Sequence, residues 1–108
     1  GFDISKYRTS ILSPKRIEFL KLEDGRNSGQ IVLSFERQER SRLYEYRIAE
    51  EKDEAGEILW NERIYTTTTS QNNVIQPVIP GKTYYLSVRS INTKGAGDWS
   101  EPRSWMAR

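Results

Sequence analysis

The feature that most limits how this chain can fold is the alternation of apolar with mostly polar residues in three segments, 31–36, 44–49 and 84–89. Successive side chains of a β-strand point to opposite faces, so a period of two describes a strand with one buried and one largely solvated face. Between residues 14 and 106, no long stretch has the i, i+3, i+4 and i+7 spacing of an amphipathic helix. We therefore expect an all-β, antiparallel protein.

Turn-forming residues divide the chain into short segments. Gly and Pro recur between the apolar runs, as in Asp24-Gly25, Ala55-Gly56 and Pro80-Gly81. Short strands at this spacing are typical of a sandwich or a barrel, and an odd number of them in 108 residues favours packed sheets of three and four strands. The seven predicted strands cover residues 15–22, 30–36, 43–50, 58–65, 73–77, 83–92 and 101–106.

The alternation also predicts the core. One member of each apolar–polar pair should point into the space between the sheets. The predicted core residues are Ile17, Ile31, Leu33, Phe35, Tyr44, Tyr46, Ile48, Val78, Tyr84, Leu86 and Val88.

The segment that follows the fifth predicted strand carries the most specific pattern. Val78 precedes a Pro-Gly turn, Tyr84 and alternating aliphatic residues follow it, and Asn92 comes before a loop that contains glycine. This pattern resembles the fibronectin type III family, and the resemblance extends over roughly residues 14–106. It implies a seven-stranded antiparallel β-sandwich of the immunoglobulin-like kind, in which the tyrosine hydroxyl bonds to the backbone a few residues upstream.

One position departs from the family pattern. The family usually has Trp in its second strand, at the centre of the core, where this chain has Phe35, and we expect Trp60 and Trp105 to compensate in volume. The positions that define the fold under this resemblance are Phe35, Pro80, Gly81, Tyr84, Asn92 and Gly95. Residues 1–13 are interpreted as a linker or leader from a preceding domain, and residues 14–108 as the fibronectin type III-like domain.

Composition excludes several kinds of chemistry. The chain has neither Cys nor His, which excludes disulfides, thiolate zinc sites, cysteine nucleophiles and the serine–histidine mechanism. The acidic segment 50–57 lacks the spacing of a calcium-binding loop and is interpreted as a solvated hairpin tip. We therefore predict no catalytic, cofactor-binding or metal-binding residues, no cofactor, and no enzymatic activity.

Charge and hydropathy limit the partners. The net charge is only +2, so nucleic acid is not expected as a partner. No apolar run approaches the roughly 18 residues of a membrane helix, so membrane insertion is not expected. The expected partners are neighbouring domains of the same chain and another protein or a glycan.

Two groups of residues are candidates for contacts. The resemblance places loops 37–42, 66–72 and 93–98 at the N-terminal end of the domain and segment 50–57 at the opposite end. The candidate loop residues are Arg37, Arg40, Arg42, Thr68, Asn72, Lys94 and Asp98. Tyr85 and Trp99 form a candidate exposed aromatic face, and Trp99 is expected to stack on an outward arginine such as Arg89.

By resemblance, the predicted function is a non-catalytic module of a larger multidomain protein, acting as a spacer and a protein-interaction domain, involved for instance in cell adhesion. One alternative is direct recognition of a host surface protein or a glycan, as in adhesion or phage tail proteins. Another is an accessory module of a secreted carbohydrate-active enzyme. The expected location is extracellular, at a cell surface or in a virion.

Overall fold

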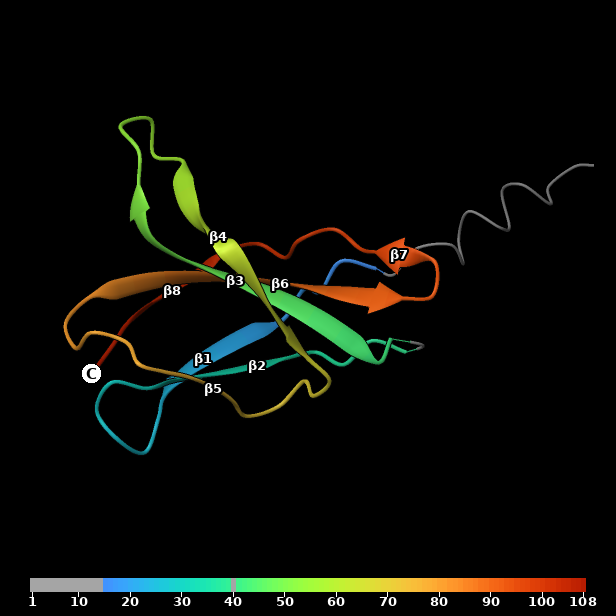
Figure 1. Cartoon of the computed structure of the whole chain (residues 1–108), viewed down its shortest axis with the longest axis horizontal. Helices are drawn as coiled ribbons and strands as arrows, with labels where there is room; N and C mark the ends of the chain where they lie inside the picture. The colour runs from blue at the N-terminus through green and yellow to red at the C-terminus, as the bar shows by residue number, and fades with distance from the viewer. Residues whose placement is uncertain (1–14, 40) are drawn as a thin grey trace, which may run out of the picture.

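The computed structural model describes residues 15–39 and 41–108, which form an all-β sandwich (Figure 1). Its eight described strands are β1 (Leu20–Asp24), β2 (Ile31–Phe35), β3 (Leu43–Lys52), β4 (Ile58–Thr67), β5 (Asn73–Ile75), β6 (Thr83–Asn92), β7 (Gly95–Ala96) and β8 (Arg103–Met106).

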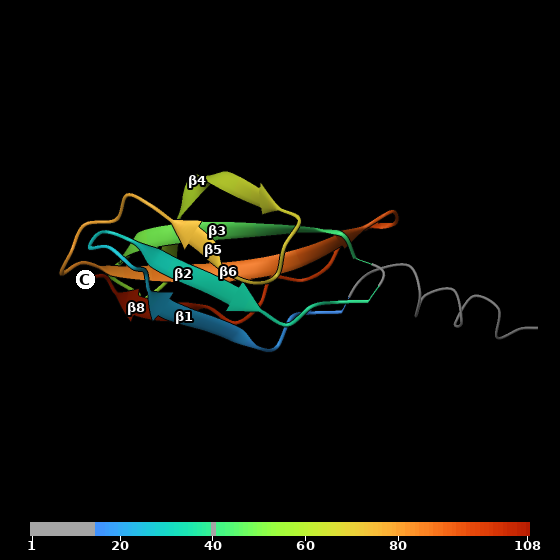
Figure 2. The same ribbon diagram turned by 90° about the horizontal axis from the view of Figure 1, so that it is seen from below.

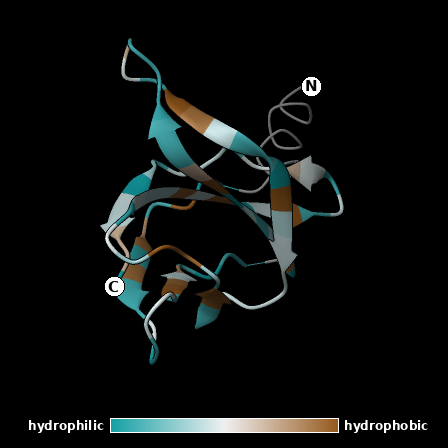
Figure 3. Ribbon diagram, turned by 60° about the vertical axis from the view of Figure 1, so that its left-hand side comes forward, coloured by the Kyte–Doolittle hydropathy of each residue, from teal (hydrophilic) through white to brown (hydrophobic). Residues whose placement is uncertain are grey.

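The strands form two antiparallel sheets that face each other (Figure 2). One sheet has the order β1-β2-β5. In the other sheet β3 lies between β4 and β6, and both β7 and β8 pair with β6. The loop between β3 and β4 is largely hydrophilic and projects away from the rest of the sandwich (Figure 3). Its position agrees with the interpretation of segment 50–57 as a solvated hairpin tip.

The core lies between the two sheets and largely matches the prediction. Every predicted core residue is buried except Tyr46, which is half-buried and packs against the edge of the core. The ring of Tyr46 stacks on that of Tyr65 from β4, with centroids 5.3 Å apart. The buried hydrophobic residues that the prediction missed are Leu20, Leu22, Ala49, Ile75 and Ala107.

Phe35, the last residue of β2, supplies a buried aromatic side chain to the core, as predicted. Its side chain is buried and meets the ring of Tyr44 edge-on, with centroids 4.8 Å apart. Trp105 packs against the core and donates a hydrogen bond from its indole nitrogen to Asp24, 2.9 Å away, which links β8 to β1. Trp60 lies on the outer face instead, so it adds no volume to the core.

The turn before β6 has the predicted geometry. The Lys82 N–H donates to the Ile79 carbonyl at 3.1 Å, and Gly81 has a φ of 88°. Pro at the second position and a left-handed Gly at the third are the features of a type II turn. The Ile79 N–H donates to the Tyr84 hydroxyl at 2.7 Å, which is the upstream backbone bond that the resemblance implied.

The strand boundaries and the number of strands differ from the prediction. The first strand is Leu20–Asp24 rather than 15–22, although Ile17 is buried as expected. The structure has eight strands rather than seven among the described residues, because the last strand is interrupted. Residues 95–96 pair with the end of β6, and Arg103–Met106 pair with the start of β6. Residues 97–102 form no strand, although Gly97 and Ser100 still donate to carbonyls of β6. Pro102 lacks the N–H that a ladder bond would need.

The described chain starts and finishes at opposite ends of the sandwich (Figure 1). The Lys15 carbonyl lies near the hydroxyl of Ser90, towards the finish of β6. Ala107 bonds to Lys82, just before β6 begins. We call these two ends of the molecule the Lys15 end and the Arg108 end.

Candidate interaction surfaces

Two loops at the Lys15 end surround a surface hollow of about 460 Å³. The residues that line it are Arg37, Ser41, Arg42, Tyr44, Thr68, Thr69 and Ser70. Three of the candidate loop residues, Arg37, Arg42 and Thr68, are therefore brought together. Arg40 lies outside the described residues. The candidates Asn72, Lys94 and Asp98 do not line this hollow, and all three are exposed.

Tyr44 anchors the first of these loops from below. Its ring is buried, and its hydroxyl accepts a hydrogen bond from the Gln38 N–H at 3.1 Å. The same hydroxyl lies 3.4 Å from the Ser41 carbonyl, to which it donates. One buried side chain thus holds both flanks of the loop between β2 and β3.

The second loop is held by a buried asparagine. The side-chain amide of Asn73 donates to the carbonyls of Thr69 and Leu33, and its oxygen accepts from the Thr67 hydroxyl at 2.7 Å. The Phe35 N–H also donates to the Ser70 carbonyl at 2.8 Å. These bonds fix the backbone of residues 67–70 against β2.

Asn72 and the β6–β7 hairpin have local structural roles. Asn72 adopts a φ of 57°, in the left-handed region that Asn tolerates better than most residues, and its N–H donates to the Ser34 hydroxyl. In the hairpin, the Asn92 side chain accepts from the Lys94 N–H at 2.8 Å, and Gly95 has a φ of 136°. Asn92 and Gly95 therefore shape this turn. Contact roles for Asn72 and Lys94 remain predictions.

A second surface lies on the outer face of the larger sheet, where arginine and tryptophan side chains stack. The guanidinium carbon of Arg47 lies 4.1 Å from the ring centroid of Trp60 and 4.3 Å from that of Trp99. The guanidinium carbon of Arg89 lies 4.4 Å from the Trp99 centroid, which confirms the predicted stacking. We call these four residues the cation–π cluster.

Charge and burial act together in this cluster. Arg89 forms an ion pair with Glu45 at 2.6 Å, so its charge is compensated. The Nε of Arg47 is buried and has no hydrogen-bond partner within residues 15–39 and 41–108. Burial, and secondly the charge of Arg89, lower the pKa of Arg47 below its usual value. The aromatic faces are therefore the principal partners of the Arg47 guanidinium.

The candidate aromatic face is less exposed than predicted. Tyr85 and Trp99 do point outward, but both are only half-exposed. Cations cover their rings: two guanidiniums lie over Trp99, and the amino group of Lys52 lies 5.0 Å from the centroid of Tyr85. The outer face therefore presents arginine and lysine side chains together with the aromatic rings.

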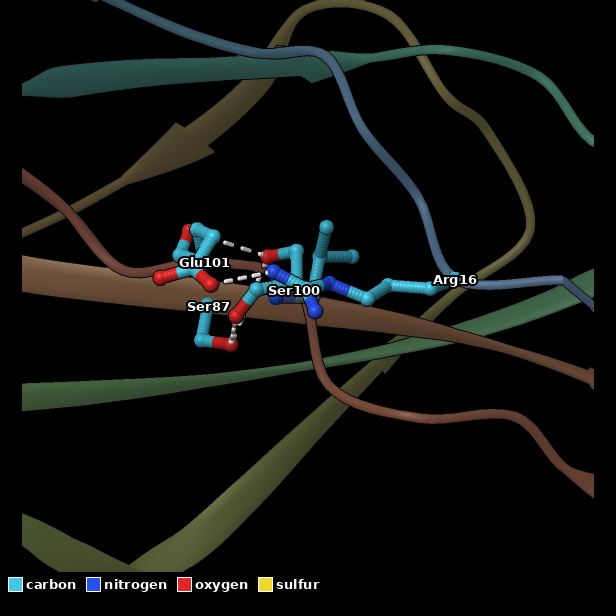
Figure 4. Close-up of polar contacts among 5 residues, drawn as sticks. Arg16, Ser87, Ser100 and Glu101 are labelled. Atoms are coloured by element: carbon cyan, nitrogen blue, oxygen red, sulfur yellow. Dashed lines mark hydrogen bonds and ion pairs between the residues drawn. The ribbon is translucent and has the colours of Figure 1, made fainter.

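Ser100 lies between β7 and β8 and makes polar contacts with residues of β6, among them Ser87 (Figure 4). Its N–H donates to the Val88 carbonyl at 2.8 Å, and its hydroxyl accepts from the Val88 N–H at 3.0 Å. Its own carbonyl accepts from the Ser87 hydroxyl at 2.8 Å. Next to it, Glu101 forms an ion pair with Arg16. A single serine therefore satisfies both backbone groups of Val88 where the sheet is interrupted.

The described part of the chain lacks two features that would indicate other kinds of site. It contains no group of three or more Asp, Glu, His or Cys side chains arranged to hold a metal ion. None of its segments is a helix long and apolar enough to cross a membrane.

Comparison with known proteins identifies the class to which this fold belongs. The fibronectin type III domain model matches residues 13–105, and the chain belongs to this family. Comparison with curated protein sequences gives no significant match. Fibronectin type III domains are commonly modules of multidomain proteins, are generally non-catalytic and are often extracellular.

Solved structures share the fold at low sequence identity. The chain is similar to the FN5 domain of Drosophila Lar, with 20% identity, a TM-score of 0.63, and coverage of 85% of this chain and 94% of that one. The FN1–FN3 domains of chicken CNTN1 give 17% identity and a TM-score of 0.66, covering 86% of this chain and 30% of that one. The C. elegans twitchin kinase region gives 16% identity and a TM-score of 0.66, covering 88% of this chain and 17% of that one.

Proposed function

We propose that this domain is a non-catalytic module of a larger extracellular protein, which holds its neighbours apart and offers its surfaces for protein contacts. The observation that carries the proposal is the position of the two ends of the described chain, at opposite ends of the sandwich (Figure 1). Ten-residue β6 runs between these ends, and ten residues of strand span roughly 33 Å. Neighbouring domains joined at the two ends would be separated by at least that distance.

Charge differs between the two ends in a way that suits a row of domains. At the Lys15 end, loop 37–42 contains three basic residues and one acidic residue. Towards the Arg108 end, segment 50–57 contains five acidic residues and one basic residue. Domains in a row would therefore bring unlike charges towards each other. The energy of such exposed pairs is small and falls with added salt.

The first test is the size and location of the native polypeptide that carries this segment, by immunoblot of fractionated source material. A large polypeptide at the cell surface, in the medium or in virions supports the proposal. A free species near 12.6 kDa in the cytosol contradicts it.

The charge arrangement is tested in a tandem of two copies, by small-angle X-ray scattering at low and high salt. We expect the distribution of interdomain distances to broaden as salt screens the attraction. A distribution that does not change with salt refutes the role of charge in stacking and leaves the spacer role intact.

A second candidate function is direct recognition of a partner by the loops at the Lys15 end. The observation that favours it is that Arg37 and Arg42 line the same hollow. Glutamine in place of each arginine should weaken partner capture if these loops make the contact. Capture that is unchanged by both substitutions contradicts this function.

A further inference from the structure

We propose that the hollow at the Lys15 end binds a tetrahedral oxyanion, namely a phosphate or sulfate group carried by a partner. The hollow is bounded by Arg37, Ser41 and Arg42 on one side and by residues 68–70 on the other, and its volume of about 460 Å³ is ample for one such group. This inference goes beyond the spacer function and does not depend on it.

The charges of the side chains that line the hollow favour the binding of an anion. Arg37 and Arg42 both line the hollow, and none of the lining residues in the described part of the chain is acidic. Neither arginine forms an ion pair within residues 15–39 and 41–108, in contrast to Arg16, Arg89 and Arg108. Because the guanidinium group is a planar fork of donors, it binds phosphate and sulfate oxygens with two parallel hydrogen bonds. Two such groups beside one hollow match a multiply charged oxyanion.

Hydroxyl groups complete the donor set. The hydroxyls of Thr68 and Ser70 make no hydrogen bond to other described residues, although both residues line the hollow. The hydroxyl of Thr69 already donates to the Gln71 carbonyl, so it is not counted as free. Hydroxyls donate readily to oxyanions, so the hollow offers uncharged donors next to the two cations.

Ser41 provides an independent observation. It lines the hollow and is only 5% exposed, and its hydroxyl oxygen is buried without a hydrogen-bond partner among the described residues. Leaving a buried hydroxyl unpaired is unfavourable. An oxyanion that enters beside Ser41 would accept this missing hydrogen bond.

The hollow is largely formed before any ligand arrives. Tyr44 holds the loop on one side through Gln38 and Ser41, and Asn73 holds the backbone of residue 69 on the other. Because these anchors are buried, binding requires little ordering of the backbone, and the remaining cost is the ordering of the two arginine side chains. Even a small ion should therefore give measurable binding.

The test is a titration of the uniformly ¹⁵N-labelled 108-residue chain, followed by two-dimensional NMR. Sodium phosphate, sodium sulfate and sodium chloride are added at matched ionic strength. We expect saturable shifts of the Ser41, Thr69 and Ser70 amide signals with phosphate, sulfate or both, with a Kd on the order of millimolar. Tighter binding of phosphate assigns the site to phosphate groups, and tighter binding of sulfate to sulfate groups.

Matched variants separate a specific site from general charge. R37Q and R42Q should each weaken binding by about tenfold, since each removes a charged pair of donors. S41A should weaken it less, by about threefold, because one neutral hydrogen bond is lost. R26Q is the control: Arg26 is exposed, lies in the β1–β2 loop at the Arg108 end, and should leave the Kd unchanged.

Three results would overturn the proposal. In the first, chloride produces the same shifts as phosphate and sulfate. In the second, R37Q and R42Q bind as tightly as the unchanged chain. In the third, the saturable shifts map to residues away from this hollow. Spectra of each variant without added anion show whether it is folded, and none of these results bears on the size of the native polypeptide.

Discussion

Replacing Ser100 with alanine removes the hydroxyl that bridges the interrupted last strand. The side chain is buried, and its oxygen is the acceptor for the Val88 N–H. Val88 is fully buried at the centre of β6, so water cannot easily take the place of this acceptor. The backbone bond from the Ser100 N–H to the Val88 carbonyl does not depend on the side chain and should persist.

The expected cost follows from one buried donor left without a partner. Such a donor costs about 1–3 kcal/mol, and we expect S100A to lower the free energy of unfolding by about 2 kcal/mol. For a domain of this size, 2 kcal/mol corresponds to a fall in Tm of roughly 10 °C. The change in side-chain volume adds little to this cost, because alanine fills most of the space that serine occupied.

Urea unfolding followed by tryptophan fluorescence measures this change, with S104A as the matched control. Ser104 lies on β8 and is exposed, so its replacement should change stability by less than about 0.5 kcal/mol. If S100A and S104A unfold within about 0.5 kcal/mol of each other, the Ser100 hydroxyl does not support the sheet and the reasoning is refuted.

Substitutions at three further positions test other parts of the fold. Y84F removes the acceptor of the Ile79 N–H and should cost about 1–2 kcal/mol in urea unfolding; an unchanged midpoint would contradict the role of the tyrosine hydroxyl in the turn. R47A should cost about 1–2 kcal/mol, and R47K less, because alanine loses both cation–π contacts; equal losses would argue against them. Burial, and secondly Tyr65, raise the pKa of Tyr46 above its usual value of about 10. The contribution of Tyr46 to the free energy of unfolding should therefore be fully present below about pH 10 and should be lost as the pH rises through the higher pKa of the folded state. Y46F should reduce this loss of stability in unfolding curves measured from about pH 9 to pH 11.

Local chemistry explains why much of the fold was predictable. The alternation at Ile31, Leu33, Leu86 and Val88 reflects the geometry of a single strand, and all four residues are buried. The Pro-Gly turn before Tyr84 likewise depends on the backbone preferences of neighbouring residues. Such preferences are already present in a short peptide, so they can be read without knowing how the strands pair.

The errors fall where distant contacts override local pattern. Ile17 is apolar and buried, yet the strand begins only at Leu20, because burial of a side chain does not require its backbone to join a ladder. Tyr46 of β3 is only half-buried, because it lines a surface hollow together with Tyr65 of β4 and Val74 of β5. Trp60 is paired with Ala49, which lies on the same face of β3 as Arg47, so its side chain points outward and stacks on Arg47.

The two candidate surfaces were likewise predictable from the sequence only in part. Residue types and turn signals were enough to nominate Arg37, Arg42 and Thr68 as loop residues and to anticipate the stacking of Arg89 on Trp99. Only the tertiary structure shows that Arg47 shares Trp99 with Arg89, and that Ser41 lines a basic hollow together with residues nearly thirty positions away. Strand period and turn chemistry act between neighbours in the chain, whereas a surface site is made by whichever segments the packing of the two sheets brings together.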